Sequence, residues 1–564
     1  VATHALSIFG DHSDVMGARQ TGFCFIASSS VQEAQDMALV SHIASLKCSL
    51  PFVHFFDGFR TSHEINTIEE IDQETIKALA PYEAIARFRN RALSPSKPTQ
   101  RGTAQNEDVF FQAREASNIF YDNVPKIVDG VFKDFYKATG RKYSAFEFYG
   151  AKDAETIVIA MGSGADTVIK TAEYLASQGK KVGAIKVRLY RPFDSRALLS
   201  KIPETTKIIT VLDRTKESGA TFEPLALDVI SALNEYSVNI PVLGGRYGLS
   251  SKDFTPTDAL AVYENMYKRS PKNHFTVGIE DDVTNTSLER KHVLDLSNGE
   301  ICCKFFGLGS DGTVSANKNT VKIIGEEAKL NGQAYFVYDS KKSGSVTTSH
   351  VRLSKNKIIA PYLISSSDFI ACHNKSFLSK FNVLEGIKTG GTFLLNAPWS
   401  DEELEKELPS SVKKQIAEKR LHFYVIDAES LAIKVGLGRR INLIMQTAFF
   451  ALANILPMKT AIEMIKSSAK KTYASKGEHV LQMNMTAIDN ALACLHEVKY
   501  PSSWKDVQVL PETSKVDNAY YNQYIKPITM LKGGTLKVSD MSPTGEVPTA
   551  TSQFEKRNIA TALP

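Results

Sequence analysis

Short apolar stretches that alternate with helical patterns are the feature that most constrains the fold of this chain. In the middle of the sequence they cover residues 156–161, 181–189 and 207–213, and a glycine turn follows the first of them. Strands that alternate with helices are typical of parallel sheets. We therefore expect an α/β fold with several parallel-sheet (βαβ) domains. One of these domains covers residues 152–282, and its strand-end loop at 213–217 is interpreted as structural.

The same architecture is expected at the start of the chain, in a domain that covers residues 1–148. Residues 5–9 and 52–56 are predicted strands, and a helical pattern between them begins near Ser30. Residues 10–12 and 57–60, which follow these strands, carry Gly, Asp, His and Arg. In open α/β sheets, ligands bind outside the carboxyl ends of the strands, so we expect both segments on one edge of the sheet.

Arg19 is the candidate catalytic residue of this first domain. A guanidinium is permanently charged and binds a carboxylate through two parallel hydrogen bonds, so a substrate carboxylate is a natural partner. The alternative is a salt bridge at the surface or at an interface. Glu33 and Glu64 each lie three residues after a Ser or Thr, which fits a helix capping box, and neither is assigned a catalytic role.

A third domain is expected over residues 300–500, and it opens with a glycine motif. A predicted strand at 301–306 is followed by Gly307, Gly309 and Gly312, and then by a predicted helix. Such glycines let the backbone approach a phosphate, and the helix N-terminus supplies free amides. The cofactor-binding candidates at this motif are the three glycines with Ser310 and Asn317. The alternative is a turn that only packs a helix on a strand.

The next predicted strand, residues 333–338, ends in a polar segment with two lysines. In a dinucleotide-binding fold an acid at this place binds a ribose hydroxyl. Lys341, Lys342 and Ser343 instead suit a phosphorylated ribose, which both NADP and coenzyme A carry. The alternative is that these lysines are solvated loop charges. Asn396, at the end of a later predicted strand, is a further candidate that lines the same cleft.

Composition excludes several classes of function. The length of 564 residues suggests three to four domains, and the net charge of +5 gives no case for nucleic-acid binding. The apolar run near residues 444–458 is too short and too polar to span a bilayer, so we expect no membrane association. Six scattered cysteines without a C-x-x-C motif predict no metal site and a protein that is not secreted. The chain begins at Val1, not Met, and is expected to be an internal piece of a longer polypeptide.

Two segments carry a resemblance to a known family. Residues 10–23, GDHSDVMGARQTGF, and residues 54–64, HFFDGFRTSHE, resemble the pyruvate:ferredoxin (flavodoxin) oxidoreductases. The resemblance implies a partial thiamine diphosphate domain on the pyrimidine side at 1–148 and a transketolase C-terminal-like domain at 152–282. It further implies a coenzyme A-binding domain, similar to the gamma part of 2-oxoacid oxidoreductases, at 300–500. Residues 501–564 are then a linker before an iron–sulfur domain that this chain lacks.

The activity that the resemblance implies is the oxidative decarboxylation of pyruvate to acetyl-coenzyme A and carbon dioxide. The implied cofactors are thiamine diphosphate, Mg²⁺ and 4Fe-4S clusters, with their ligands outside this chain, and electrons pass to ferredoxin or flavodoxin. In the family, the arginine that matches Arg19 contacts the pyruvate carboxylate, and the third domain closes over coenzyme A. A homodimer in the cytoplasm, or in a hydrogenosome or mitochondrion-like organelle, is expected. This piece alone is expected to be inactive.

Two alternatives to this function stay open at the level of sequence. The first is an NADP-linked pyruvate oxidoreductase with the same core, which differs only downstream. The second is a non-catalytic scaffold, as in the related portion of some sulfite reductase-type flavoproteins.

Overall fold

The computed structural model describes residues 5, 7–297, 299–309, 311–327, 330–338, 345–509 and 516–555. It divides into two compact units. Unit 1 comprises Val1–Ser62, Ile68–Leu296 and Ile359–Tyr362, and unit 2 comprises His63–Thr67, Ser297–Ile358 and Leu363–Pro564. No helix within the described residues is long and apolar enough to cross a membrane.

A six-stranded sheet forms the larger half of unit 1, and its strands are parallel except at one edge. In spatial order the strands are β10 (Phe275–Thr276), β9 (Val242–Arg246), β8 (Ile208–Asp213), β5 (Thr156–Met161), β6 (Val182–Val187) and the antiparallel β4 (Phe146–Gly150). Along β5, Val158 faces α7 (Ser163–Ser177) and α10 (Pro256–Met266), whereas Ile157 faces α9 (Pro224–Glu235). This arrangement confirms the parallel α/β architecture predicted from the alternating strands and helices.

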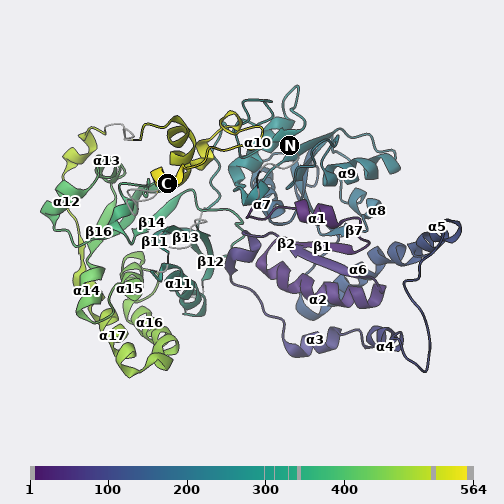
Figure 1. The fold of residues 1–564 in the computed structure, drawn as a ribbon, viewed down its shortest axis with the longest axis horizontal. Helices are drawn as coiled ribbons and strands as arrows, with labels where there is room; N and C mark the ends of the chain where they lie inside the picture. Colours follow the sequence, from purple (N-terminus) through teal and green to yellow (C-terminus); the bar gives the residue numbers. More distant parts are fainter. Residues whose placement is uncertain are drawn as a thin grey trace. The chain divides into compact units, whose positions relative to one another are not determined.

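A three-stranded sheet forms the other half of unit 1. Its order is β2 (Phe52–Phe56), β1 (Cys24–Ser28) and β7 (Leu189–Arg191), with β1 parallel to β2 and antiparallel to β7. Apolar residues of α2 (Val31–Cys48) and α6 (Asn118–Thr139) cover one face of this sheet, and Figure 1 shows the two helices beside it. Every residue of β1 is buried, because Cys24 and Ile26 pack against α2 and α6 while Phe25 and Ala27 pack into a second apolar core.

The first predicted strand is wrong. Residue 5 and residues 7–10 form no strand, and the strand that pairs with β2 is β1, fifteen or more residues later in the chain. Ile8 is largely exposed, while Phe9 packs edge-on against Phe59 with ring centroids 4.5 Å apart. The described residues of this segment therefore form a coil, in which Phe9 packs against Phe59 and Ser7 Oγ donates to Ser250 Oγ at 2.7 Å.

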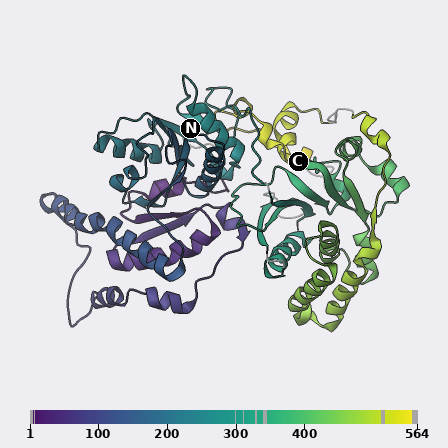
Figure 2. The ribbon, with the colours of Figure 1, turned by 180° about the vertical axis from the view of Figure 1, so that it is seen from behind.

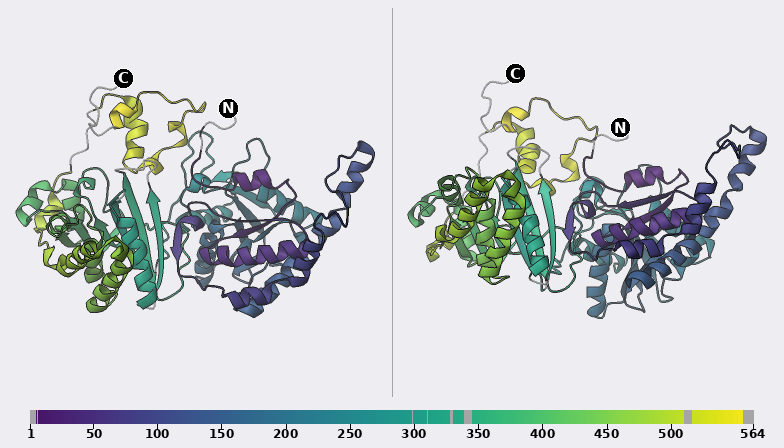
Figure 3. Two further views of the ribbon diagram at one scale, coloured as in Figure 1. Left: turned by 60° about the horizontal axis from the view of Figure 1, so that its bottom comes forward. Right: turned by 90° about the horizontal axis from the view of Figure 1, so that it is seen from below.

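The remaining helices of unit 1 are α1 (Ser13–Ala18), α3 (Gln73–Leu79), α4 (Tyr82–Asn90), α5 (Glu107–Glu115) and α8 (Ser195–Leu199). Helix α5 contributes no buried residue, and Figure 3 shows it projecting at the end of α6. Phe110 and Phe111 on α5 are 55% and 71% exposed. Large apolar side chains exposed together are typical of a surface that another protein segment covers.

An eight-stranded mixed sheet organises unit 2. In spatial order its strands are β17 (Leu495–Glu497), β16 (His422–Ile426), β15 (Ile387–Asn396), β14 (Ser367–Cys372), β11 (Ile301–Leu308), β13 (Val346–Ser354), β12 (Asn331–Tyr338) and β3 (Glu64–Asn66). Strands β11, β14, β15 and β16 are parallel, as the repeated βα pattern predicts. Strand β13 lies between β11 and β12 and is antiparallel to both.

Helices cover both faces of this sheet. One apolar core lies under α11 (Thr313–Glu327), α15 (Asn442–Ala453), α16 (Met458–Tyr473) and α17 (Glu478–Asn490), and Figure 2 shows the light green helices of this group from behind. The other core lies under α12 (Asp401–Glu407) and α13 (Ser410–Glu418). Helices α14 (Ala428–Lys434), α18 (Lys526–Thr529) and α19 (Ser552–Glu555) complete the unit.

Sheet membership crosses the predicted domain boundaries in three places, and one of them is β4, which begins within the segment 1–148 but pairs with β6 of the second segment. Strand β7 belongs to the segment 152–282 but pairs with β1 of the first segment. Strand β3 belongs to the segment 1–148 but pairs with β12 in unit 2. The sheets therefore include strands from more than one of the predicted ranges of sequence.

Candidate functional site

The two polar segments predicted on one edge of the first domain do lie together. The Cα atoms of Gly10 and Gly58 are so close that a Cβ added to Gly10 would lie 3.2 Å from the Gly58 Cα. Next to this contact, His12 Nε2 lies 2.7 Å from Asp57 Oδ1. Ser251 Oγ donates to the carbonyl oxygens of both glycines, at 2.9 and 3.0 Å. The edge is therefore a tightly packed structure and not two independent loops.

Asp57 is the centre of a buried polar cluster at this edge. Besides His12, its carboxylate contacts Arg214 Nη1 at 2.9 Å and accepts from Ser163 N and Oγ at 2.8 and 2.5 Å. Burial alone would raise the pKa of Asp57, but the Arg214 guanidinium and His12 outweigh it and hold the pKa well below its usual range. Gly162 is required beside the cluster, since a Cβ there would lie 3.0 Å from His12 Nε2.

The loop that follows β8 holds helix α1 at successive points. His12 N donates to the Arg214 carbonyl at 2.9 Å, and Ser13 Oγ lies 3.2 Å from Thr215 Oγ1. At the other end of the helix, Arg19 Nη2 lies 3.2 Å from Glu217 Oε2. This loop, which the sequence indicated as structural, thus positions the helix that carries the candidate catalytic arginine.

Arg19 lies at the C-terminal end of α1 and is accessible to solvent. Its Nη1 donates to the Met16 carbonyl at 2.8 Å, and its side chain is 24% exposed. The guanidinium keeps further N–H donors that make no hydrogen bond within the described part of the chain. The predicted alternative, a salt bridge, is present as the contact with Glu217, and the remaining donors still suit a small carboxylate.

The two glutamates noted in the sequence are engaged elsewhere. Glu33 is buried beside Lys186 Nζ at 3.1 Å and Arg188 Nη2 at 2.7 Å. Burial opposes its ionisation, yet Arg188 and Lys186 hold the pKa of Glu33 well below its usual range. Glu64 lies on β3 in unit 2, where it accepts from Gln333 Nε2 at 2.8 Å and Tyr335 Oη at 2.6 Å. Neither carboxylate is a free acid or base.

In unit 2, the glycine motif forms the predicted turn between β11 and α11. A Cβ on Gly307 would lie 2.5 Å from Thr313 Oγ1, and Gly312 has a positive φ of 89°. The Asp311 carboxylate accepts from Leu308 N and from Thr313 N, both at 2.7 Å, while Gly309 N donates to Ser345 O at 2.8 Å. These amides are therefore already used, and a phosphate here would have to displace the Asp311 carboxylate.

Three further polar side chains lie at or near this strand edge. His373, directly after β14, is buried with its Nδ1 2.7 Å from Thr313 Oγ1, and burial lowers the pKa of His373 to about 4 while Asp311 opposes that shift. Asn396 donates to the His373 carbonyl at 2.9 Å and accepts from Ala428 N at 3.1 Å, so its amide joins two strand ends. Asn317 is 4% exposed, and its Nδ2 has no hydrogen-bond partner among the described residues.

The other candidates of the third domain cannot be placed. Ser310, Lys341, Lys342 and Ser343 lie outside the described residues. The strand after which the lysines follow, β12, is separated from β11 by β13. The two phosphate-binding elements predicted from the sequence therefore do not follow neighbouring strands, and their joint role stays a prediction.

Sequence reasoning assigned no role at the site to the residues that join the segments, and it interpreted the 213–217 loop, which contains Arg214 and Glu217, as structural. Arg214, Glu217 and His373 each follow a strand end, and that position is the only local signal that marks them. Their partners lie far away in the sequence. Within the described residues, no cluster of three or more His, Cys, Asp or Glu side chains could hold a metal ion.

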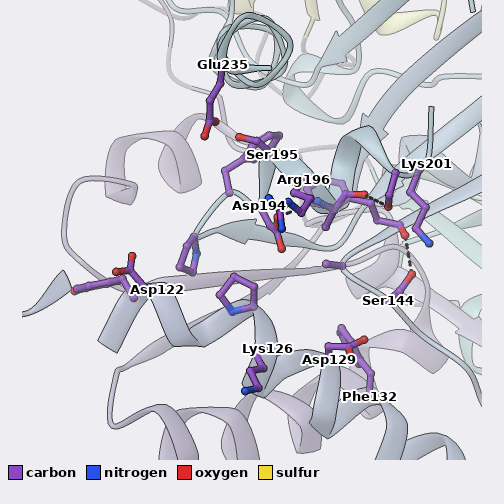
Figure 4. Close-up of a pocket in the computed structure, with 18 of the residues that line it drawn as sticks. Asp122, Lys126, Asp129, Phe132, Ser144, Asp194, Ser195, Arg196, Lys201 and Glu235 are labelled. Carbon is purple, nitrogen blue, oxygen red and sulfur yellow. Dashed lines mark hydrogen bonds between the residues drawn. The ribbon is translucent and has the colours of Figure 1, made fainter. Parts of the chain in front are cut away.

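A separate cavity of about 780 Å³ lies in unit 1 between α6 and the loop before α8. Figure 4 shows acidic Asp122 and Asp129 with Lys126 on the α6 side, and Asp194, Arg196 and Lys201 across from them. The walls thus carry both signs of charge. This cavity contains none of the residues that the sequence nominated.

Comparison with known families covers most of the chain in successive segments. The family described as "Pyruvate flavodoxin/ferredoxin oxidoreductase, thiamine diP-bdg" matches residues 1–133. "Pyruvate:ferredoxin oxidoreductase core domain II" matches residues 154–259, and "Pyruvate ferredoxin/flavodoxin oxidoreductase" matches residues 302–494. A domain of unknown function matches residues 509–560.

Several curated proteins are similar over the whole chain. The pyruvate:ferredoxin oxidoreductase of Moorella thermoacetica is 53% identical, and the match covers 100% of this chain and 48% of that protein. The pyruvate-flavodoxin oxidoreductase of Trichormus variabilis is 49% identical, with 100% and 48% covered. The NADP(+)-linked pyruvate dehydrogenase of Cryptosporidium parvum is 49% identical, with 100% and 31% covered. The chain thus spans about half or less of the length of these relatives.

Proposed function

Because the chain belongs to the pyruvate:ferredoxin/flavodoxin oxidoreductase family, we propose that the complete protein oxidatively decarboxylates pyruvate. The products are acetyl-coenzyme A and carbon dioxide, and the electrons pass through iron–sulfur clusters to ferredoxin or flavodoxin. The observation that carries this proposal is the placement of Arg19. A permanently charged, solvent-accessible guanidinium with spare donors lies at the C-terminal end of helix α1, and the buried Asp57 cluster holds the other end of that helix through His12.

The residues of unit 1 fit the binding of pyruvate better than they fit the activation of a cofactor. Thiamine diphosphate, when bound, supplies the delocalisation of charge that decarboxylation of a 2-oxo acid requires. The carboxylates of Glu33, Asp57 and Glu64 all form ion pairs or hydrogen bonds with other side chains of this chain. None of them therefore fits the acid that would activate that cofactor. We propose that this acid, the Mg²⁺ site and the cluster ligands lie outside this chain. Arg19 then binds and orients the substrate carboxylate.

Unit 2 is proposed to bind coenzyme A. Among the described residues of the glycine motif, the amides of Leu308 and Thr313 donate to the Asp311 carboxylate, so a phosphate would have to displace that carboxylate to use them. Asn317 supports the proposal, since its buried Nδ2 has no partner within the described residues and can donate to a ligand. Lys341 and Lys342 are proposed to contact the phosphates, as the sequence predicts.

Assembly and location are part of the same proposal. We propose a homodimer, for which the exposed phenylalanines of α5 offer an apolar surface. The compartment is proposed to be the cytoplasm or a hydrogenosome-like organelle. A second candidate function is the NADP-linked version of the enzyme, which is favoured by the whole-chain match to the Cryptosporidium parvum protein.

Anaerobic dye reduction tests this function. The full-length protein, purified with its clusters and thiamine diphosphate, is mixed with pyruvate and a low-potential dye, with and without coenzyme A. Pyruvate-dependent reduction that coenzyme A stimulates is the expected result. Repeating the assay with ferredoxin, flavodoxin and NADP identifies the acceptor. Failure to reduce the dye in cluster-loaded protein would refute the proposed function.

A further inference from the structure

The contact between Arg19 and Glu217 has a consequence for how a substrate binds. Any carboxylate that binds Arg19 meets a guanidinium that already has a carboxylate beside it, with Nη2 and Oε2 3.2 Å apart. Two carboxylates that share one guanidinium repel each other. Glu217 therefore acts on the affinity of the site whether or not it touches the substrate.

Glu217 is placed so that it can give way to a substrate. Its side chain is 41% exposed, and Arg19 is its sole ionic partner within the described residues. Its backbone is fixed independently of the side chain, because Glu217 N donates to Glu223 Oε2 at 2.5 Å and Glu223 in turn pairs with Arg246. The carboxylate can swing away from Arg19 while the loop keeps its shape.

Arg19, by contrast, is held in place when Glu217 leaves. Its Nη1 donates to the Met16 carbonyl at 2.8 Å, and helix α1 is anchored through His12 to the buried Asp57 cluster. The guanidinium therefore stays on its helix end with Nη2 vacated. Vacating Nη2 exposes a second donor beside the free ones, which is what two-point binding of a carboxylate needs.

We propose that Glu217 is an internal competitor that a substrate carboxylate displaces from Arg19, and that it thereby sets the affinity of the site for a monocarboxylic 2-oxo acid. This inference rests on the proposed function and extends it to a residue of the second domain. In the free protein, the Glu217 carboxylate neutralises Arg19. In the substrate complex, the substrate carboxylate takes its place and Glu217 turns to solvent.

The first test is kinetic and uses the full-length, cluster-loaded enzyme. Glu217→Gln keeps the size of the side chain and removes its charge, so the KM for pyruvate is expected to fall about fivefold, with kcat retained. The KM should also rise more steeply with salt than in the parent, since Arg19 then presents an uncompensated charge. A structural defect would not improve substrate binding. Asp153→Asn, which breaks an exposed pair with Lys181, is the matched control and should leave KM unchanged.

The second test needs no catalysis. Phenylglyoxal modifies accessible arginines, and mass spectrometry of the Arg19 peptide follows its rate in the 564-residue chain. Glu217→Gln is expected to speed the modification of Arg19 severalfold, while Glu217→Asp, which keeps the charge, gives a rate closer to the parent. An unchanged or raised KM in the active enzyme, or an unchanged modification rate, overturns the inference. If Glu217→Gln speeds the modification of Arg19 but the parent enzyme oxidises no pyruvate, the proposed function is wrong while the Arg19–Glu217 contact is confirmed.

Discussion

Replacing Asp57 with Asn should destabilise unit 1 more than any single surface change, because Asp57 balances buried positive charge. Asp57 is fully buried, and its carboxylate is shared by Arg214, His12 and Ser163. In Asp57→Asn an NH₂ group replaces one of the two carboxylate oxygens. Either Ser163, or Arg214 together with His12, would then face a hydrogen-bond donor in place of an acceptor. Arg214, with a side chain only 3% exposed, then keeps an uncompensated charge.

The expected cost is about 3–5 kcal/mol, the range for removing one partner of a buried ion pair. At a slope of about 3 kcal/mol/M, this corresponds to a fall of about 1 M or more in the urea midpoint of the transition that reports unit 1. Urea titration of the purified chain, followed by circular dichroism, measures it. Because α1 is anchored through His12, the same variant in the complete enzyme should also raise the KM for pyruvate.

A matched control separates burial from the mere loss of an ion pair. Asp228 binds Arg191 through two contacts, at 3.0 and 3.2 Å, but both side chains are 23% exposed. Asp228→Asn should cost about 1 kcal/mol or less. Equal midpoints for Asp57→Asn and Asp228→Asn would refute the reasoning that the Asp57 cluster is held by uncompensated buried charge.

Three other expectations follow from the same geometry. An alanine at a positive φ costs about 1–2 kcal/mol of unfolding free energy, and Gly179→Ala, whose Cβ would meet no other atom, should show only this cost in urea titrations. Gly162→Ala should cost more, because its Cβ would also collide with the Asp57 carboxylate. Asp311→Asn removes a negative charge from the N-terminus of α11, so the KM for coenzyme A should fall about twofold or more, and an unchanged KM would count against binding at this turn. The pKa of His373 is lowered to about 4 by burial, so the folded state binds fewer protons than the unfolded state between about pH 6.5 and about pH 4. Stability should therefore decrease as pH falls through that window, by about 2 kcal/mol between about pH 7 and about pH 5, and His373→Gln should remove that part of the loss.

The sequence predicted the parts of the fold that depend on local pattern. Strands β5, β8 and β11 are predominantly apolar and are followed by turn residues, and their predicted positions are confirmed. Strand β13 was not predicted, because its buried positions include Ser349, His350 and Arg352 and it lacks the apolar signal of a central strand. The strand predicted at residues 5–9 is wrong for the opposite reason, since its described residues form a coil in which Ile8 is largely exposed despite being apolar.

The candidate site was predictable only up to the point where distant segments meet. Residues 10–12 and 57–60 do lie together, as the His12–Asp57 contact shows, but only residues 57–60 follow a strand, so the strand geometry that predicted the contact holds for one of the two segments. That Arg214 and Glu217 reach the same helix did not follow, because these residues enter from another sheet far along the chain. Hydrophobic periodicity reports which face of an element is buried but carries no information on which loops converge.

The most direct test of the central claim is the kinetics of Arg19→Ala in the complete, cluster-loaded enzyme. Loss of charge-assisted hydrogen bonds to the substrate carboxylate should raise the KM for pyruvate about 10- to 100-fold, while the KM for coenzyme A stays as in the parent. Arg19→Lys, which keeps the charge without the planar fork, should lie in between. An Arg19→Ala enzyme with the parent's KM for pyruvate would contradict the account, because Arg19 would then serve only as the salt-bridge partner of Glu217.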